Sequence, residues 1–251
     1  MPPEALPPTT FRPLLTAFKV LAVPMLLLTW IEGPALADST RMGVVPSSLD
    51  ASTQSYLRFF NAGASANTVD VSIADPATGN VLATWTSPQV SAGTATQVAI
   101  STIEKAATAS FVKPANYSLS VTSRFQGYAQ SVLYRPTEGT LSNITSCEKG
   151  LVTAGTAVPY VHSRLLSGGF PSHLVLSNTG SAATTATLGI YDETSGTKLG
   201  KYTTSSIPAS AVLLVDVSDI ETKSRIQPRT GQYHYIVKVE SAFTGSLQHI
   251  V

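Results

Sequence analysis

The sequence predicts an all-β protein made of two tandem β-sandwich domains related by an internal duplication. Ser55 to Glu104 recurs without a gap as Ser172 to Glu221, and about a third of the aligned positions are identical, more than shared composition produces. Each copy consists of short alternating or β-branched segments separated by turn residues, with no sustained helical period. These observations favour a pair of sandwiches over any helical or mixed fold.

The first copy holds six expected strands and the second copy holds six at corresponding places. In the first copy they are Tyr56–Asn61, Thr68–Ala74, Val81–Thr86, Ala95–Ser101, Tyr117–Arg124 and Tyr128–Tyr134. In the second copy they are His173–Asn178, Thr185–Tyr191, Lys198–Thr203, Ala211–Val217, Tyr235–Ser241 and Ser246–Val251, with a possible seventh over Leu151–Val161.

The turns between these strands have matching chemistry in the two copies. Asp75 to Gly79 and Asp192 to Gly196 each begin with an Asp that can bond the backbone ahead and end with a Gly that can take positive φ. Asn61-Ala62-Gly63 and Asn178-Thr179-Gly180 predict a second shared turn. Thr102 to Ala107 predicts one short helical turn, with its isoleucine in the core.

Strand periodicity assigns the faces of the first strand. Leu57 and Phe59 match Leu174 and Leu176, which predicts an inward face. The opposite parity carries Tyr56, Arg58 and Phe60 in one copy but His173, Val175 and Ser177 in the other, which predicts an outer face. Trp85 and Tyr202 are aromatic in both copies and are assigned to packing.

Aromatic and Arg clusters on an outer sheet face mark interfaces. The candidate partner-binding residues are therefore Tyr56, Arg58, Phe60, Tyr128 and Tyr134. Stacking on glycans is a related reading, and a purely structural role in covering the sheet edge or docking on the linker remains open.

The first 37 residues read as a secretory signal peptide, with cleavage after Ala37. Arg12 and Lys19 precede an apolar run from Val20 to Ile31, which is too short to span a bilayer. A retained amphipathic anchor is the alternative. We therefore expect an exported protein, periplasmic, on the cell surface or secreted, with no transmembrane span.

The remaining composition excludes some partners. Residues after Ala37 carry 14 basic and 13 acidic side chains, so we expect no nucleic-acid partner. The single cysteine, Cys147, means that neither domain relies on a disulfide. An unpaired exported thiol can link two chains, and a thiol tucked under the linker is the other reading.

A resemblance follows from the turn and strand pattern. The apolar strand, the Asn-x-Gly turn, the second strand ending in Asp, the Thr-Gly or Ser-Gly hairpin, and the turns at Ile207-Pro208-Ala209 and Ser91-Ala92-Gly93 resemble bacterial immunoglobulin-like repeats of the CARDB or adhesin type, found in exported and adhesive proteins. The resemblance implies two immunoglobulin-like domains, over 38–146 and 161–251 with a linker at 147–160, and no catalytic residues to carry over.

The chain offers little chemistry of its own. It contains no nucleophile elbow, zincin helix, phosphate loop or paired-cysteine site, so no catalytic residue, cofactor or metal is expected. The four histidines, His162, His173, His234 and His249, are spread along the chain without metal-ligand spacing, and the outer edge near His173 or His234 is where a metal site would lie if one existed.

Four carboxylates that recur in the two copies are assigned structural roles. Asp75 and Asp192 suit turn capping better than calcium binding, since each stands nearly alone. Glu104 and Glu221 are expected to be solvated and to cap or pair locally.

Three functional hypotheses remain. The first is a non-enzymatic surface, matrix or periplasmic module that binds a protein or glycan through an outer sheet face or an open strand edge. The second is a periplasmic assembly chaperone, against which direct repetition of one unit argues. The third is an accessory extracytoplasmic enzyme, which would need a pocket of converged catalytic groups that the sequence does not offer.

Overall fold

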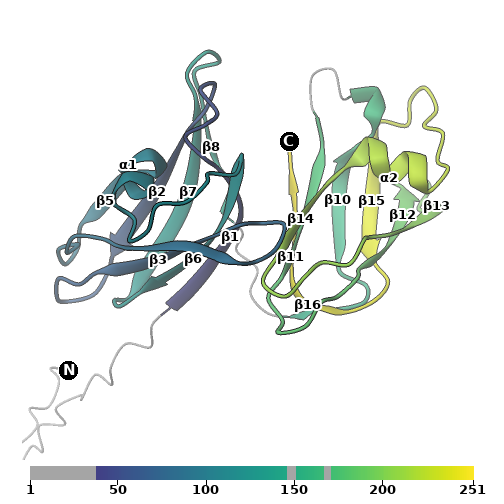
Figure 1. The fold of residues 1–251 in the computed structure, drawn as a ribbon. Helices are drawn as coiled ribbons and strands as arrows, with labels where there is room; N and C mark the ends of the chain where they lie inside the picture. The colour runs from purple at the N-terminus through teal and green to yellow at the C-terminus, as the bar shows by residue number, and fades with distance from the viewer. Residues whose placement is uncertain (1–37, 146–150, 167–170) are drawn as a thin grey trace, which may run out of the picture. The chain divides into compact units, whose positions relative to one another are not determined.

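The computed structural model describes residues 38–145, 151–166 and 171–251 (Figure 1). Its regular structure is almost entirely β, which confirms the predicted all-β class. We call 38–145 the N-terminal half and 151–251 the C-terminal half. The predicted signal peptide and Cys147 lie outside the described residues.

The N-terminal half contains eight strands and one short helix in the order below. They are β1 (Asp38–Pro46), β2 (Gln54–Asn61), β3 (Val69–Ala74), β4 (Val81–Thr86), β5 (Ala95–Ala99), α1 (Ile100–Ala106), β6 (Asn116–Ser123), β7 (Gly127–Arg135) and β8 (Thr140–Asn143). The strands form two antiparallel sheets, with orders β1-β6-β3-β4 and β5-β2-β7-β8.

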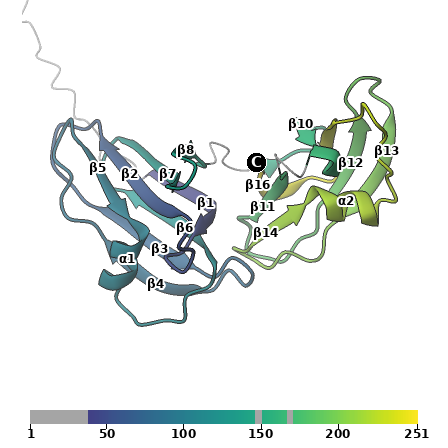
Figure 2. The same cartoon turned by 90° about the horizontal axis from the view of Figure 1, so that it is seen from above.

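The described part of the C-terminal half repeats this plan in seven strands, while its eighth strand, β9, comes at the start of the half rather than at its end. Its elements are β9 (Leu151–Val152), β10 (Ala157–His162), a 3₁₀ turn at Arg164–Leu166, β11 (His173–Asn178), β12 (Thr187–Asp192), β13 (Lys198–Thr203), β14 (Val212–Asp216), α2 (Val217–Lys223), β15 (His234–Val239) and β16 (Phe243–Ile250). Its sheets have the orders β10-β15-β12-β13 and β14-β11-β16-β9. In each half the two sheets form separate layers (Figures 1 and 2).

Each half buries its own hydrophobic core, to which both of its sheets contribute. In the N-terminal half, Leu57 and Phe59 on β2 belong to the same cluster as Val71 and Ile73 on β3. In the C-terminal half the equivalent cluster includes Leu174, Leu176, Leu188 and Ile190. Alternate residues of these strands point inward because side chains on a strand alternate between its two faces. Trp85 and Tyr202 are buried, so their assignment to packing is confirmed.

An asparagine at the end of β2 and another at the end of β11 tie loops together in the same way. Asn61 Nδ2 donates to the carbonyl oxygens of Ser65 and Val90, and its Oδ1 accepts from Gly63 N. Asn178 makes the matching bonds to the carbonyls of Ala182 and Ile207 and accepts from Gly180 N. Both side chains are buried, so these bonds satisfy backbone groups that water does not reach.

The hairpin turns have the predicted chemistry. Asp75 Oδ1 accepts from Ala77 N at 2.7 Å, and Asp192 Oδ1 accepts from Ser195 N at 2.7 Å. Gly79 and Gly196 have φ of +74° and +68°, the left-handed region that glycine enters without a Cβ clash. Turn capping by these two aspartates is therefore confirmed.

The short helices begin earlier than predicted. Residues 100–101 and 217, predicted as strand ends, are already helical in α1 and α2. Ile100 and Val217 are buried at these helix starts, and the predicted core anchor Ile103 is 1% exposed. Each helix follows a strand of one sheet and precedes a strand of the other, so burial of its isoleucine holds the crossing against the core.

Three segments differ from the sequence prediction. β1 and β8 were not expected, since polar residues and Gly43 interrupt the alternation in β1 and β8 is only four residues long. The possible strand over Leu151–Val161 is divided into β9 and β10, which join different sheets. Gly155, at φ +94°, lies in the turn between them and permits the change of direction.

Candidate functional site

The outer face of β2 carries the predicted aromatic and Arg residues. Leu57 and Phe59 are buried in the core, while Tyr56, Arg58 and Phe60 alternate with them and are partly exposed. The structure thus places these three side chains on the side of the sheet β5-β2-β7-β8 that faces away from its core.

Strand register divides the five predicted partner-binding residues into two groups. Phe60 lies opposite Tyr128 on β7, and their rings stack with centroids 5.4 Å apart. Tyr134 instead lies opposite Gln54, at the other end of β2, where Tyr56 Oη donates to Gln54 Oε1 at 2.6 Å. Six residues of strand separate the two ends, or roughly 20 Å.

A shallow groove of about 390 Å³ lies at the Phe60 end of this face. Phe60 and Tyr128 supply aromatic surface, and Tyr128 is 54% exposed. Arg58, Gln97 and Gln130 supply a guanidinium and two amides, and Arg58 Nε donates to Gln97 Oε1 at 2.6 Å. The groove therefore offers flat apolar surface next to fixed polar groups, a combination that recognises ligands with both kinds of surface.

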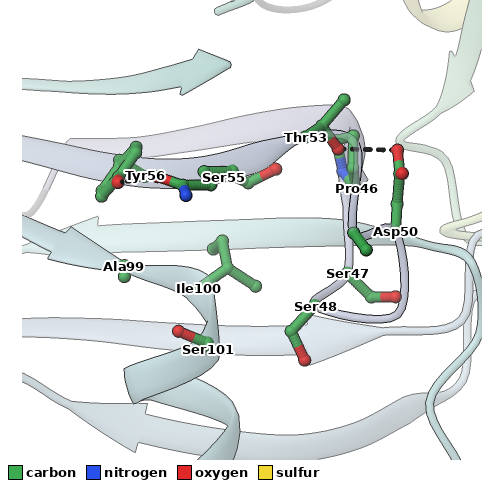
Figure 3. A pocket seen from close by; sticks show the side chains of 12 residues that line it. Pro46, Ser47, Ser48, Asp50, Thr53, Ser55, Tyr56, Ala99, Ile100 and Ser101 are labelled. Carbon is green, nitrogen blue, oxygen red and sulfur yellow. Dashed lines mark hydrogen bonds between the residues drawn. The ribbon is translucent and has the colours of Figure 1, made fainter. Parts of the chain in front are cut away.

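A second hollow of about 390 Å³ lies at the Tyr56 end (Figure 3). Tyr56 and Ser55 from β2, the start of α1 at Ile100, and the loop after β1 form its walls. Ser55 is buried, and its Oγ has no hydrogen-bond partner among the described residues. This end of the face is lined mainly by hydroxyl groups rather than by aromatic rings.

Asp50 is the carboxylate beside this hollow, and its oxygens serve its own loop. Oδ1 accepts from Ser52 N and Oγ, and Oδ2 accepts from Thr53 Oγ1 at 2.7 Å, the dashed bond in Figure 3. The bonds from Ser52 and then Thr53 hold the pKa of Asp50 below its ordinary value. Asp50 is thus an ionised loop organiser rather than a group prepared for proton transfer.

Glu104 and Glu221 are buried, and the prediction that they are solvated is wrong. Glu104 accepts from Tyr117 Oη at 3.1 Å and pairs with Lys113 Nζ at 2.7 Å. Glu221 accepts from Tyr235 Oη at 2.8 Å and pairs with Arg164 Nε at 3.4 Å. The cations come from segments outside the aligned copies, so comparison of the copies gave no signal for this burial.

The histidines are not spread out, which corrects the sequence interpretation. His162 at the end of β10 lies opposite His234 at the start of β15, with ring centroids 5.2 Å apart. The His249 ring on β16 lies 5.8 Å from that of His162. His173 is near enough to His249 to affect its protonation. Within the described ranges, however, no three His, Cys, Asp or Glu side chains already stand as a metal-ligand set.

Within the described residues, no helix has the length and apolar character needed to cross a membrane. Searches against protein-family models, curated proteins and solved structures found no match.

Proposed function

We propose that this chain is an exported, non-enzymatic binding protein made of two immunoglobulin-like β-sandwich domains, which recognises a glycan through the outer face of β5-β2-β7-β8. The common order of seven strands in the two halves and their separate cores support the two-domain assignment. The signal-peptide pattern in residues 1–37 supports export to the periplasm, cell surface or medium.

The observation that carries the binding proposal is the groove beside Phe60 and Tyr128. Its volume of about 390 Å³ lies within the range of small-ligand sites. A stable protein interface needs roughly 800 Å² on each partner, far more than one such hollow supplies. A sugar ring can place its apolar C–H face on the stacked aromatic rings and its hydroxyls against Gln97, Gln130 and Arg58. A short glycan therefore fits the groove better than a folded protein does.

Binding of the purified, fluorescently labelled chain to an array of defined glycans tests this proposal. We expect Tyr128→Ala and Phe60→Ala each to weaken binding of the preferred glycan at least about tenfold, as loss of a central aromatic anchor does. Tyr233→Ala is the matched control, because Tyr233 is an exposed tyrosine in the C-terminal half. Tyr56→Ala tells whether the other end of the face takes part.

Two results would contradict the glycan assignment. Equal glycan binding by the wild type, Tyr128→Ala and Phe60→Ala would remove the groove from consideration. An array without signal, together with Tyr128-dependent capture of a protein from a cell-surface extract, would replace the glycan with a protein partner on the same face.

A further inference from the structure

All four histidines of the chain gather near one end of the sheets of the C-terminal half. They come from four strands, β10, β11, β15 and β16, and from both sheets. His162 and His234 are cross-strand neighbours in one sheet, and His249 lies in the other. His234 is 36% exposed at its side chain, so an ion from solvent can reach the group.

The spacings of the His162 ring from the other two rings are close to those of imidazoles that share one ion. A zinc ion bonds imidazole nitrogen at about 2.05 Å, so two rings on one tetrahedral ion have centroids roughly 5 Å apart. The His162–His234 and His162–His249 centroids are 5.2 and 5.8 Å apart. The rings are tilted by 60° and 84°, so bringing their nitrogens together requires rotation about the terminal torsion, which is soft for histidine.

Neighbouring groups determine which ring nitrogens are available to an ion. Glu193 Oε2 lies 3.3 Å from His234 Nδ1, which leaves Nε2 to bind, an arrangement common among metal-ligating histidines. Ser172 Oγ contacts His249 Nε2, so Nδ1 is the other candidate atom.

His173 belongs to a different contact. Its Nδ1 lies 2.6 Å from Asp216 Oδ1 on the neighbouring strand β14, and on β16 it lies opposite Ile250, whereas His249 lies opposite Leu174. It therefore provides an internal control, a nearby histidine outside the proposed ligand set.

We propose that His162, His234 and His249 bind a divalent transition-metal ion such as Zn²⁺, Cu²⁺ or Ni²⁺, whose preference for imidazole nitrogen matches this set. Because His249 lies in one sheet and the other two lie in the opposite sheet, the ion joins the two sheets of the C-terminal half at that end. The ion stabilises this half, since it binds the folded arrangement and not the unfolded chain.

Calorimetric titration of the EDTA-stripped, dialysed chain with Zn²⁺, Ni²⁺ and Mg²⁺ at pH 7.5 tests the site. We expect one Zn²⁺ or Ni²⁺ per chain, no Mg²⁺ binding, and a higher thermal midpoint with bound metal. His162→Gln and His234→Gln are each expected to weaken Zn²⁺ binding at least about tenfold, His249→Gln to weaken it, and His173→Gln to match the wild type. Circular dichroism of each variant establishes that it is folded.

Three outcomes would overturn the proposal. One is the absence of saturable one-to-one binding in the folded wild type. Another is undiminished Zn²⁺ affinity in a folded double variant, His162→Gln with His234→Gln. Loss of binding in His173→Gln but in none of the three ligand variants would also overturn it.

Discussion

The two halves bury the same carboxylate but neutralise it with different cations. In the N-terminal half, Glu104 pairs with Lys113, which follows α1 in the chain, and also accepts a bond from Ser48 N. In the C-terminal half, Glu221 pairs with Arg164, which comes before β11, and accepts a bond from Arg164 N. Both carboxylates also bind a tyrosine hydroxyl from the following strand.

This comparison separates what the fold requires from what it can exchange. A carboxylate with a fully buried side chain requires a counter-charge and hydrogen-bond donors, because an unpaired charge in the interior is costly. In both halves a tyrosine hydroxyl and a loop backbone N–H bind the carboxylate. The residue that supplies the positive charge differs between the halves, because any long cationic side chain that reaches the site from solvent satisfies the same requirement.

The largest expected effect comes from removing the carboxylate. Glu104→Ala and Glu221→Ala should each lower the unfolding free energy of their own half by about 3 kcal/mol. Each substitution leaves a buried tyrosine hydroxyl and a cationic side chain without the carboxylate that they bind. Hydrogen exchange of peptides from each half, measured by mass spectrometry, assigns the loss to one half. Glu138→Ala is the control, because that side chain is 58% exposed. Losses below about 1 kcal/mol in both variants would show that the carboxylates are dispensable.

Acid should weaken the N-terminal half through Glu104. Burial raises the pKa of Glu104, but bonds from Lys113, Ser48 and Tyr117 outweigh burial, and the net pKa lies below the ordinary 4.5. The ionised form therefore stabilises the folded half above pH 4.5, and this contribution is lost as the pH falls through the lowered pKa. Asp70, whose pKa is lowered by its bonds from Arg124 and Thr86, acts in the same direction.

Thermal unfolding between pH 7 and pH 3 measures this acid dependence. Glu104→Gln should make the thermal midpoint depend less on pH below pH 4.5, whereas Glu138→Gln should leave this pH dependence as in the wild type. An unchanged slope in Glu104→Gln would assign the acid sensitivity to other carboxylates.

The smallest expected effect exchanges one turn residue between the halves. Gly93 and Ser210 occupy matching turns, with φ of +68° and +61°. Ser210 has a Cβ in this left-handed region, so Ser210→Gly should raise stability by about 0.5–1 kcal/mol, and Gly93→Ser should lower it by a similar amount. Chemical denaturation of the two single variants measures the change in unfolding free energy that each substitution causes. If both substitutions changed the unfolding free energy in the same direction, side-chain contacts, rather than the backbone conformation, would determine stability at these turns.

Local features of the fold were predictable from sequence. The Asp75 and Asp192 turns, the inward Leu57 and Phe59, and the core position of Ile103 all follow from turn chemistry and strand periodicity. β1 was missed because its polar residues and glycine hide the alternation that identifies a strand.

The candidate sites were only partly predictable, because they depend on which strands become neighbours. Periodicity placed Phe60 and Tyr128 among the outer-face candidates, but only strand register brings them together and separates Tyr134 from them. The histidines were misread for the same reason, since His162 and His249 lie in different sheets and share no local pattern. Burial of Glu221 depends on Arg164, which lies outside the aligned copies.

Each half has an edge strand close to the point where the chain passes from one half to the other. β8 pairs with β7 in the N-terminal half, and β9 pairs with Phe243 and Thr244 of β16 in the C-terminal half. A fragment that ended before Thr140, or one that began at Ala157, would leave part of such an edge without its partner. Unpaired edge strands accept strands from other molecules, so fragments cut at those points are expected to self-associate, whereas fragments that retain β8 or β9 keep this protection against aggregation.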